Sequence, residues 1–97
     1  MADVEFSRGG RSLKPNPKEV TIDVPTGLVL PKRGISVSSR PEKVERFGGA
    51  FRVLSLPPEL EIVQRGRDPT HYEVIPVRPM TMQEYEDALA KIVLIPA

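Results

Sequence analysis

The sequence predicts an α+β domain with a mainly antiparallel sheet, and three observations lead to this prediction. The chain has 97 residues, so we expect one domain, residues 1–97, with a small core. Eleven prolines and seven glycines favour short strands and tight turns over a helical bundle. Apolar and polar residues alternate in several short segments, which is typical of half-buried strands. We expect six or seven strands, one short helix and one C-terminal helix.

Three alternating segments in the first half of the chain are expected to be strands. Val4 and Phe6 alternate with polar residues and predict the first strand. Residues 20–24 read Val, Thr, Ile, Asp and Val, the pattern of a half-buried strand. Residues 35–38 form the third segment, in which two serines share one face. Paired serines on a strand usually meet water, but in a cleft they offer hydroxyl groups to a ligand.

Two segments carry the start signal of a helix. Residues 39–42, Ser-Arg-Pro-Glu, have capping-box spacing and predict a short helix that ends at Gly48-Gly49. Residues 81–84 repeat that spacing, and apolar residues follow at helical intervals through Ile92, so an amphipathic helix should lie on the sheet. Further strands are expected at residues 51–53 and 62–63. Residues 93–95 either close the sheet as a strand or continue the apolar packing.

Residues 66–80 gather polar groups around one short apolar run. They contain the only histidine of the chain, one tyrosine, one glutamate and two arginines. The segment alternates from His71 onward, so His71 and Glu73 should share one strand face and Tyr72 the other. Pro76 donates no backbone hydrogen bond, so the strand ends there or lies at an edge. Polar groups on one strand face can line a cleft, which makes this segment the candidate site.

Charge and composition exclude several classes of function. The formal net charge is +1, from 14 basic and 13 acidic residues, which argues against nucleic acid or an anionic membrane as a partner. The chain has no cysteine, which excludes disulfides, thiol catalysis and cysteine zinc sites, and we expect no metal. No apolar run approaches the ~20 residues of a membrane helix. The N-terminus is too acidic for a signal peptide, so we expect a cytoplasmic protein, or export by a route without such a signal.

Three blocks of sequence occur in the same order as in a known toxin family. Thr70-His71-Tyr72, with Ile75-Pro76 and Pro79-Met80 after it, is the most specific block. Gly34-Ile35-Ser36-Val37 is the middle block, with isoleucine where the family has threonine. Glu5-Phe6-Ser7-Arg8 is placed like the first-strand arginine motif of the family. Together the blocks resemble the ADP-ribosyltransferase-like effector toxins of type VI secretion, although this chain is shorter and would be a minimal member.

This resemblance implies a split-sheet fold around a cleft that binds NAD as a substrate. Arg8 would hold the phosphates, Ser36 and Ser38 would supply hydroxyl groups, and Tyr72 would stack or pack at the cleft wall beside the hydrogen-bonding His71. The shared face of His71 and Glu73 makes Glu73 the candidate catalytic carboxylate, which would stabilise an oxocarbenium-like transition state. The alternative for Glu73 is a solvated carboxylate paired with Arg67 or Arg78, and for His71 a structural imidazole.

The resemblance also implies partners, and two other functions stay open. A toxin of this kind would modify a macromolecular acceptor and be neutralised by a cognate immunity protein or antitoxin. A small ribonuclease toxin is the second interpretation, because a histidine, a glutamate and arginines suffice for cleaving RNA by general acid–base catalysis. A protein-binding module that keeps the fold without catalysis is the third.

Overall fold

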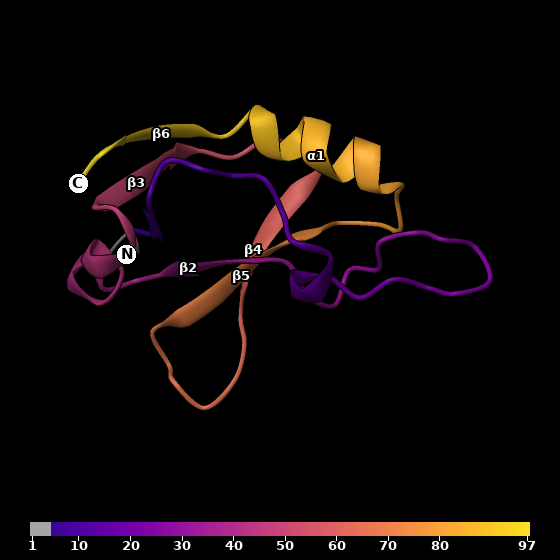
Figure 1. Cartoon of the computed structure of the whole chain (residues 1–97), viewed down its shortest axis with the longest axis horizontal. Helices are drawn as coiled ribbons and strands as arrows, with labels where there is room; N and C mark the ends of the chain where they lie inside the picture. Colours follow the sequence, from indigo (N-terminus) through magenta and orange to yellow (C-terminus); the bar gives the residue numbers. More distant parts are fainter. Residues whose placement is uncertain (1–4) are drawn as a thin grey trace.

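The computed structural model describes residues 5–97, in which six short strands and one α-helix follow one another with three 3-10 turns between them (Figure 1). The strands are β1 (Ser7–Gly9), β2 (Ile35–Ser38), β3 (Ala50–Ser55), β4 (Leu60–Gln64), β5 (His71–Pro76) and β6 (Val93–Pro96). The α-helix is α1 (Met82–Ala90), and the 3-10 turns are η1 (Pro17–Glu19), η2 (Pro41–Lys43) and η3 (Glu45–Phe47). Six strands form one antiparallel sheet in the order β4-β5-β2-β1-β3-β6. This confirms the α+β prediction and the antiparallel sheet.

Helix α1 covers one face of the sheet and closes the core. Its N-terminus has both halves of the expected capping box, because Thr81 Oγ1 accepts from the Glu84 amide at 3.0 Å and Glu84 Oε1 accepts from the Thr81 amide at 3.0 Å. Tyr85 and Leu89 are buried against apolar residues of β2 and β5. Ile92 follows the end of the helix but is also buried, so the apolar spacing correctly predicted the packed side.

The hydroxyl of Tyr85 is inserted between β2 and β5. It donates to the carbonyl of Val74 at 2.6 Å and accepts from the amide of Ile35 at 3.1 Å. Ile35 and Val74 stand opposite one another in the register, so the hydroxyl relays a hydrogen bond across the pair. A side chain on Gly34 has no room here, because its Cβ would lie 1.7 Å from the Val74 oxygen. These contacts fix the register of the two strands that carry the candidate site.

The middle of the sheet is held by a short junction. Strands β1 and β2 are joined at one register pair, Ser7 with Ser38. Beyond this pair the Arg8 guanidinium donates to the carbonyl oxygen of Ser36 at 2.7 Å and to that of Ser12 at 3.2 Å. The resemblance implied a split sheet, whereas the six strands form one sheet that narrows at this junction.

Residues 20–24 are not the strand that their alternation predicted. Ile22 makes only an isolated bridge with Val29, and Val24 is 91% exposed. The reason is a turn that begins inside the segment, because the amide of Asp23 donates to the carbonyl of Leu28 and the amide of Gly27 donates to that of Asp23. The backbone groups that a neighbouring strand would need are therefore used within the turn.

The predicted short helix and the first strand also differ from expectation. Residues 41–47 form two successive 3-10 turns, and the first has Arg40 as its N-cap without a side-chain cap, so the predicted capping box of Ser39 is wrong. The amide of Ser39 instead donates to the carbonyl of Thr70. Gly48 ends the segment in a left-handed conformation, as expected. Strand β1 begins after Phe6, and Val4 lies outside the described residues.

Three further sequence predictions are confirmed. Strands β3 and β4 contain the predicted segments 51–53 and 62–63. Residues 93–95 belong to β6, which pairs with β3 at the edge of the sheet. Strand β5 ends at Pro76, although it lies between two neighbours and not at an edge.

Candidate functional site

Two neighbouring strands bring the predicted polar residues onto one face. In the register of β2 with β5, Ser36 stands opposite Glu73 and Ser38 stands opposite His71. Because side chains of an antiparallel pair that stand opposite one another project to the same side, these four residues share a face. Tyr85 and α1 pack against the other face, which carries the apolar residues of the same strands. The candidate site therefore lies on the face opposite α1.

Glu73 and His71 form a hydrogen-bonded pair. The carboxyl group of Glu73 is buried, with 7% of the residue exposed. Its Oε1 accepts from the amide of Gly34 at 3.2 Å, and its Oε2 lies 3.1 Å from Nε2 of His71. Glu73 is thus not the solvated carboxylate paired with Arg67 or Arg78 of the alternative interpretation. The pair fixes the orientation of the imidazole and leaves its second nitrogen, Nδ1, unused by Glu73.

A pocket of about 540 Å³ lies over this pair of strands. Ser36, Ser38 and His71 line it from the sheet, whereas Glu73 lies behind His71 and is not among the lining residues. The remaining wall comes from η2, η3 and the turn before β5, and includes Glu42, Lys43, Val44, Arg46, Phe47 and Asp68. This volume is in the range of small-molecule sites.

An ion pair joins the two sides of the pocket wall. Nζ of Lys43, in η2, lies 3.1 and 3.3 Å from the carboxylate oxygens of Asp68 and 2.9 Å from Oγ1 of Thr70. The hydroxyl and then the amide of Thr70 donate to Asp68, and with Lys43 they lower the pKa of Asp68 to about 2. Asp68 is therefore a carboxylate at neutral pH, and its negative charge balances the positive charge of Lys43.

Arg46 and Phe47 form the part of the wall contributed by η3. The Arg46 guanidinium carbon lies 4.9 Å from the centroid of the Phe47 ring, and Phe47 is 59% exposed. Glu42 also lines the pocket and is paired with Arg40. A hydrogen bond from its own backbone, and then the Arg40 guanidinium, lower the pKa of Glu42. These contacts leave a polar pocket with an aromatic edge.

Two predicted site residues lie on the other face of the sheet. Tyr72 stands opposite Val37, and its ring packs edge-on against Phe6 with centroids 4.7 Å apart. Arg8 follows Ser7 in β1 and so points to the side opposite Ser7 and Ser38. The structure therefore does not bring Arg8 and Tyr72 together with His71.

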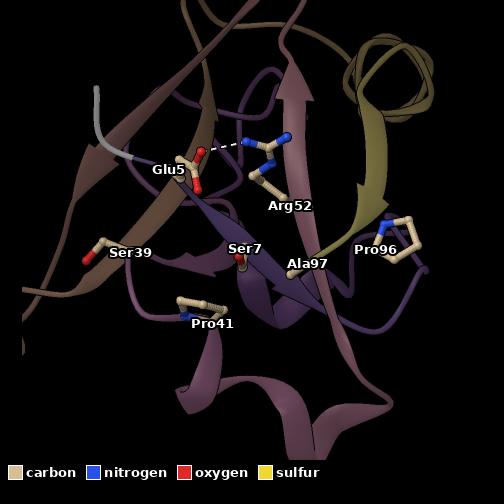
Figure 2. Close-up of a pocket in the computed structure, with 7 residues that line it drawn as sticks. All are labelled: Glu5, Ser7, Ser39, Pro41, Arg52, Pro96 and Ala97. Atoms are coloured by element: carbon tan, nitrogen blue, oxygen red, sulfur yellow. Dashed lines mark hydrogen bonds and ion pairs between the residues drawn. The ribbon is translucent and has the colours of Figure 1, made fainter. Parts of the chain in front are cut away.

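A second hollow of about 650 Å³ lies beside the first, over β1 and β3 (Figure 2). Ser7 and Arg52 stand opposite each other in its floor, and Arg52 is paired with Glu5. Pro41 of η2 lines this hollow, while the rest of η2 lines the first pocket. None of the predicted site residues lines it.

The residues of the pocket wall were not predicted from the sequence. Phe47 falls inside the predicted short helix, but its side chain is exposed beside Arg46. The sequence feature that could have indicated this exposed position is an aromatic residue next to an arginine, just before two glycines. Lys43 and Asp68 lie 25 residues apart in the sequence and gave no signal of their pairing.

Comparison with protein-family models, curated proteins and solved structures finds no significant match for this chain. Within residues 5–97, no three histidine, aspartate or glutamate side chains are grouped closely enough to hold a metal ion. In the same part of the chain, no helix is both long and apolar enough to cross a membrane.

Proposed function

We propose that this protein is a small ADP-ribosyltransferase-like toxin domain that cleaves NAD in the pocket lined by Ser36, Ser38 and His71. One observation carries the proposal. Two blocks that resemble the toxin family, 34 to 37 and 70 to 72, are far apart in the sequence, yet Ser36 of the first and His71 of the second line the same pocket. A buried carboxylate is hydrogen-bonded directly behind the histidine. Hydroxyl and imidazole groups at one end of a polar pocket suit the ribose of a dinucleotide.

The reaction follows from the chemistry of the pair. The bond between the ribose C1′ and nicotinamide breaks, nicotinamide leaves with the bonding electrons, and positive charge grows on the sugar. The buried carboxylate of Glu73 lies 3.1 Å from Nε2 of His71, and its negative charge would stabilise the charge on the sugar from behind the imidazole. A nucleophile of the acceptor then forms a bond to C1′, and its proton passes to Nδ1 of His71. With water as the acceptor, the products are ADP-ribose and nicotinamide.

The resemblance supports a role in competition between bacteria. The domain would act in the cytoplasm of a target cell and transfer ADP-ribose to a macromolecular acceptor. A cognate immunity protein or antitoxin would neutralise it, most simply by covering the pocket.

The test is nicotinamide release from NAD, followed by chromatography. We expect His71→Ala and Glu73→Gln to lower the rate by 100-fold or more, on the order found for general acid–base groups. Ser55→Ala, an exposed serine of β3 outside the pocket, is the control and should keep the wild-type rate. Because an undetected acceptor would limit turnover, NAD binding is measured by calorimetry in parallel. A folded wild-type protein that does not bind millimolar NAD contradicts the proposal.

The two alternatives give different results in the same series. If the protein cleaves RNA and His71→Ala abolishes that cleavage, the protein is a ribonuclease and not a transferase. If His71→Ala and Glu73→Gln both capture a partner as well as the wild type does, and the protein turns over neither NAD nor RNA, the protein is a binding module.

A further inference from the structure

Arg46 differs from the other charged groups that line the pocket. Lys43 is neutralised by Asp68, and Glu42 is paired with Arg40. Among residues 5–97, no carboxylate lies within ion-pair distance of Arg46. The wall of the pocket therefore carries one guanidinium whose charge is not compensated. An uncompensated arginine beside serine hydroxyls is the usual composition of an anion site.

The ring of Phe47 orients this arginine. The guanidinium carbon lies 4.9 Å from the ring centroid, so the flat group is held against an aromatic surface. A guanidinium that lies over a ring uses no N–H···O hydrogen bond there, so its N–H groups stay available to an acceptor. A fork held in one orientation loses less side-chain entropy when it binds two oxygens at once.

We propose that Arg46 binds the diphosphate of a nucleotide ligand in this pocket. This inference rests on the proposed function, since NAD would supply the diphosphate. The exposed hydroxyl of Ser36 provides a further donor from the floor of the pocket. Arg8 is not available in the same way, because its Nε and Nη1 donate to backbone carbonyl groups and its side chain lies on the other face. A pocket of about 540 Å³ has room for a nucleoside diphosphate and is much larger than an inorganic anion needs.

The probe is ADP, and binding is measured by calorimetry and by amide NMR. Arg46→Met removes the charge and keeps an unbranched stem over Phe47. We expect it to weaken ADP binding by about 10- to 100-fold, the usual effect of losing charge-assisted hydrogen bonds to a ligand. Arg46→Lys should recover part of the affinity, because an ammonium restores the charge but not the fork. Binding of adenosine, which has no phosphate, should be the same in wild type and Arg46→Met.

Arg11 offers a matched control. Its guanidinium carbon lies 5.0 Å from the centroid of the Phe51 ring, so it makes the same kind of stacking contact, and it lines a different pocket. Arg11→Met should leave ADP binding unchanged. An equal loss in both variants would show a general effect of surface charge and would overturn the inference. Amide shifts on ADP addition should centre on residues 36–47.

The outcomes separate this inference from the proposed function. ADP binding that depends on Arg46, in a folded protein that does not bind millimolar NAD, supports the inference and contradicts the transferase. NAD cleavage with ADP affinity unchanged in Arg46→Met supports the transferase and overturns the inference. A folded wild-type protein that binds no ADP overturns the inference as well.

Discussion

Replacing Tyr85 by phenylalanine tests the hydrogen-bond relay between β2 and β5. The substitution removes one hydroxyl and leaves the ring in the core. The carbonyl of Val74 then loses its donor at 2.6 Å, and the amide of Ile35 loses its acceptor at 3.1 Å. Tyr85, Val74 and Ile35 are all fully buried, so water does not replace the lost partner. Each unsatisfied buried group costs about 1–3 kcal/mol, and we expect the free energy of unfolding to fall by about 2–4 kcal/mol in total.

The assay is urea unfolding followed by circular dichroism. With an m-value of about 1.5 kcal/mol per molar urea, the midpoint should fall by about 1–3 M. Tyr72→Phe removes the only other tyrosine hydroxyl, which has no hydrogen-bond partner among the described residues, and should change stability by less than about 0.5 kcal/mol. A loss below about 1 kcal/mol in Tyr85→Phe would refute the reasoning. It would mean that the two strands close and that Ile35 donates directly to Val74.

Three further predictions use the same contacts. Burial raises the pKa of Tyr85 to about 12 from 10.0. The contribution of the neutral hydroxyl to the free energy of unfolding is therefore complete below pH 10 and is lost as the pH rises through 12, by up to about 3 kcal/mol. Unfolding measured against pH should show this loss in wild type and not in Tyr85→Phe. Gly34→Ala should fail to fold by circular dichroism, because its Cβ would overlap the Val74 oxygen, whereas Gly27→Ala has open space and should cost only about 1 kcal/mol for its positive φ. The Thr70 hydroxyl and amide lower the pKa of Asp68 to about 2, so the ionised Asp68 stabilises this turn above pH 4 and stops doing so as the pH falls through 2. The NMR shift of the Thr70 amide should therefore titrate near pH 2. A midpoint near pH 4 would contradict the geometry.

Local patterns predicted the parts of the structure that local chemistry decides. The alternation from His71 placed His71 and Glu73 on one face because side chains alternate in any strand, whatever its partner. The capping box at Thr81 was predictable for the same reason, since all its hydrogen bonds lie within four residues. Residues 20–24 show the limit of this approach. Their alternation carries no information about a neighbouring strand. The backbone amide and carbonyl of Asp23 make their hydrogen bonds within a turn and not with a neighbouring strand.

The candidate site was only half predictable. Ser36, Ser38 and His71 could be named from strand faces, but the wall made by η2 and η3 depends on how the chain returns over the sheet. Nothing in the sequence near Lys43 indicates that it reaches Asp68. The helical spacing of apolar residues predicted the packed side of α1, where Tyr85 lies. The position of the Tyr85 hydroxyl depends on the separation of two strands, and the periodicity of the sequence gives no information about that separation.

The narrow junction at Ser7 and Ser38 divides the sheet into two three-stranded blocks that share one register pair. Strands β4, β5 and β2 carry the pocket floor, whereas η2 and η3 pack on β1 and β3, so the floor and the wall belong to different blocks. The close approach of Phe47 to Gly9 fastens that wall to β1. A change in the twist between the two blocks would therefore change the width of the pocket. The ion pair between Lys43 and Asp68 spans the two blocks and limits how far the pocket opens. Each block should exchange its amide hydrogens as a separate cooperative unit.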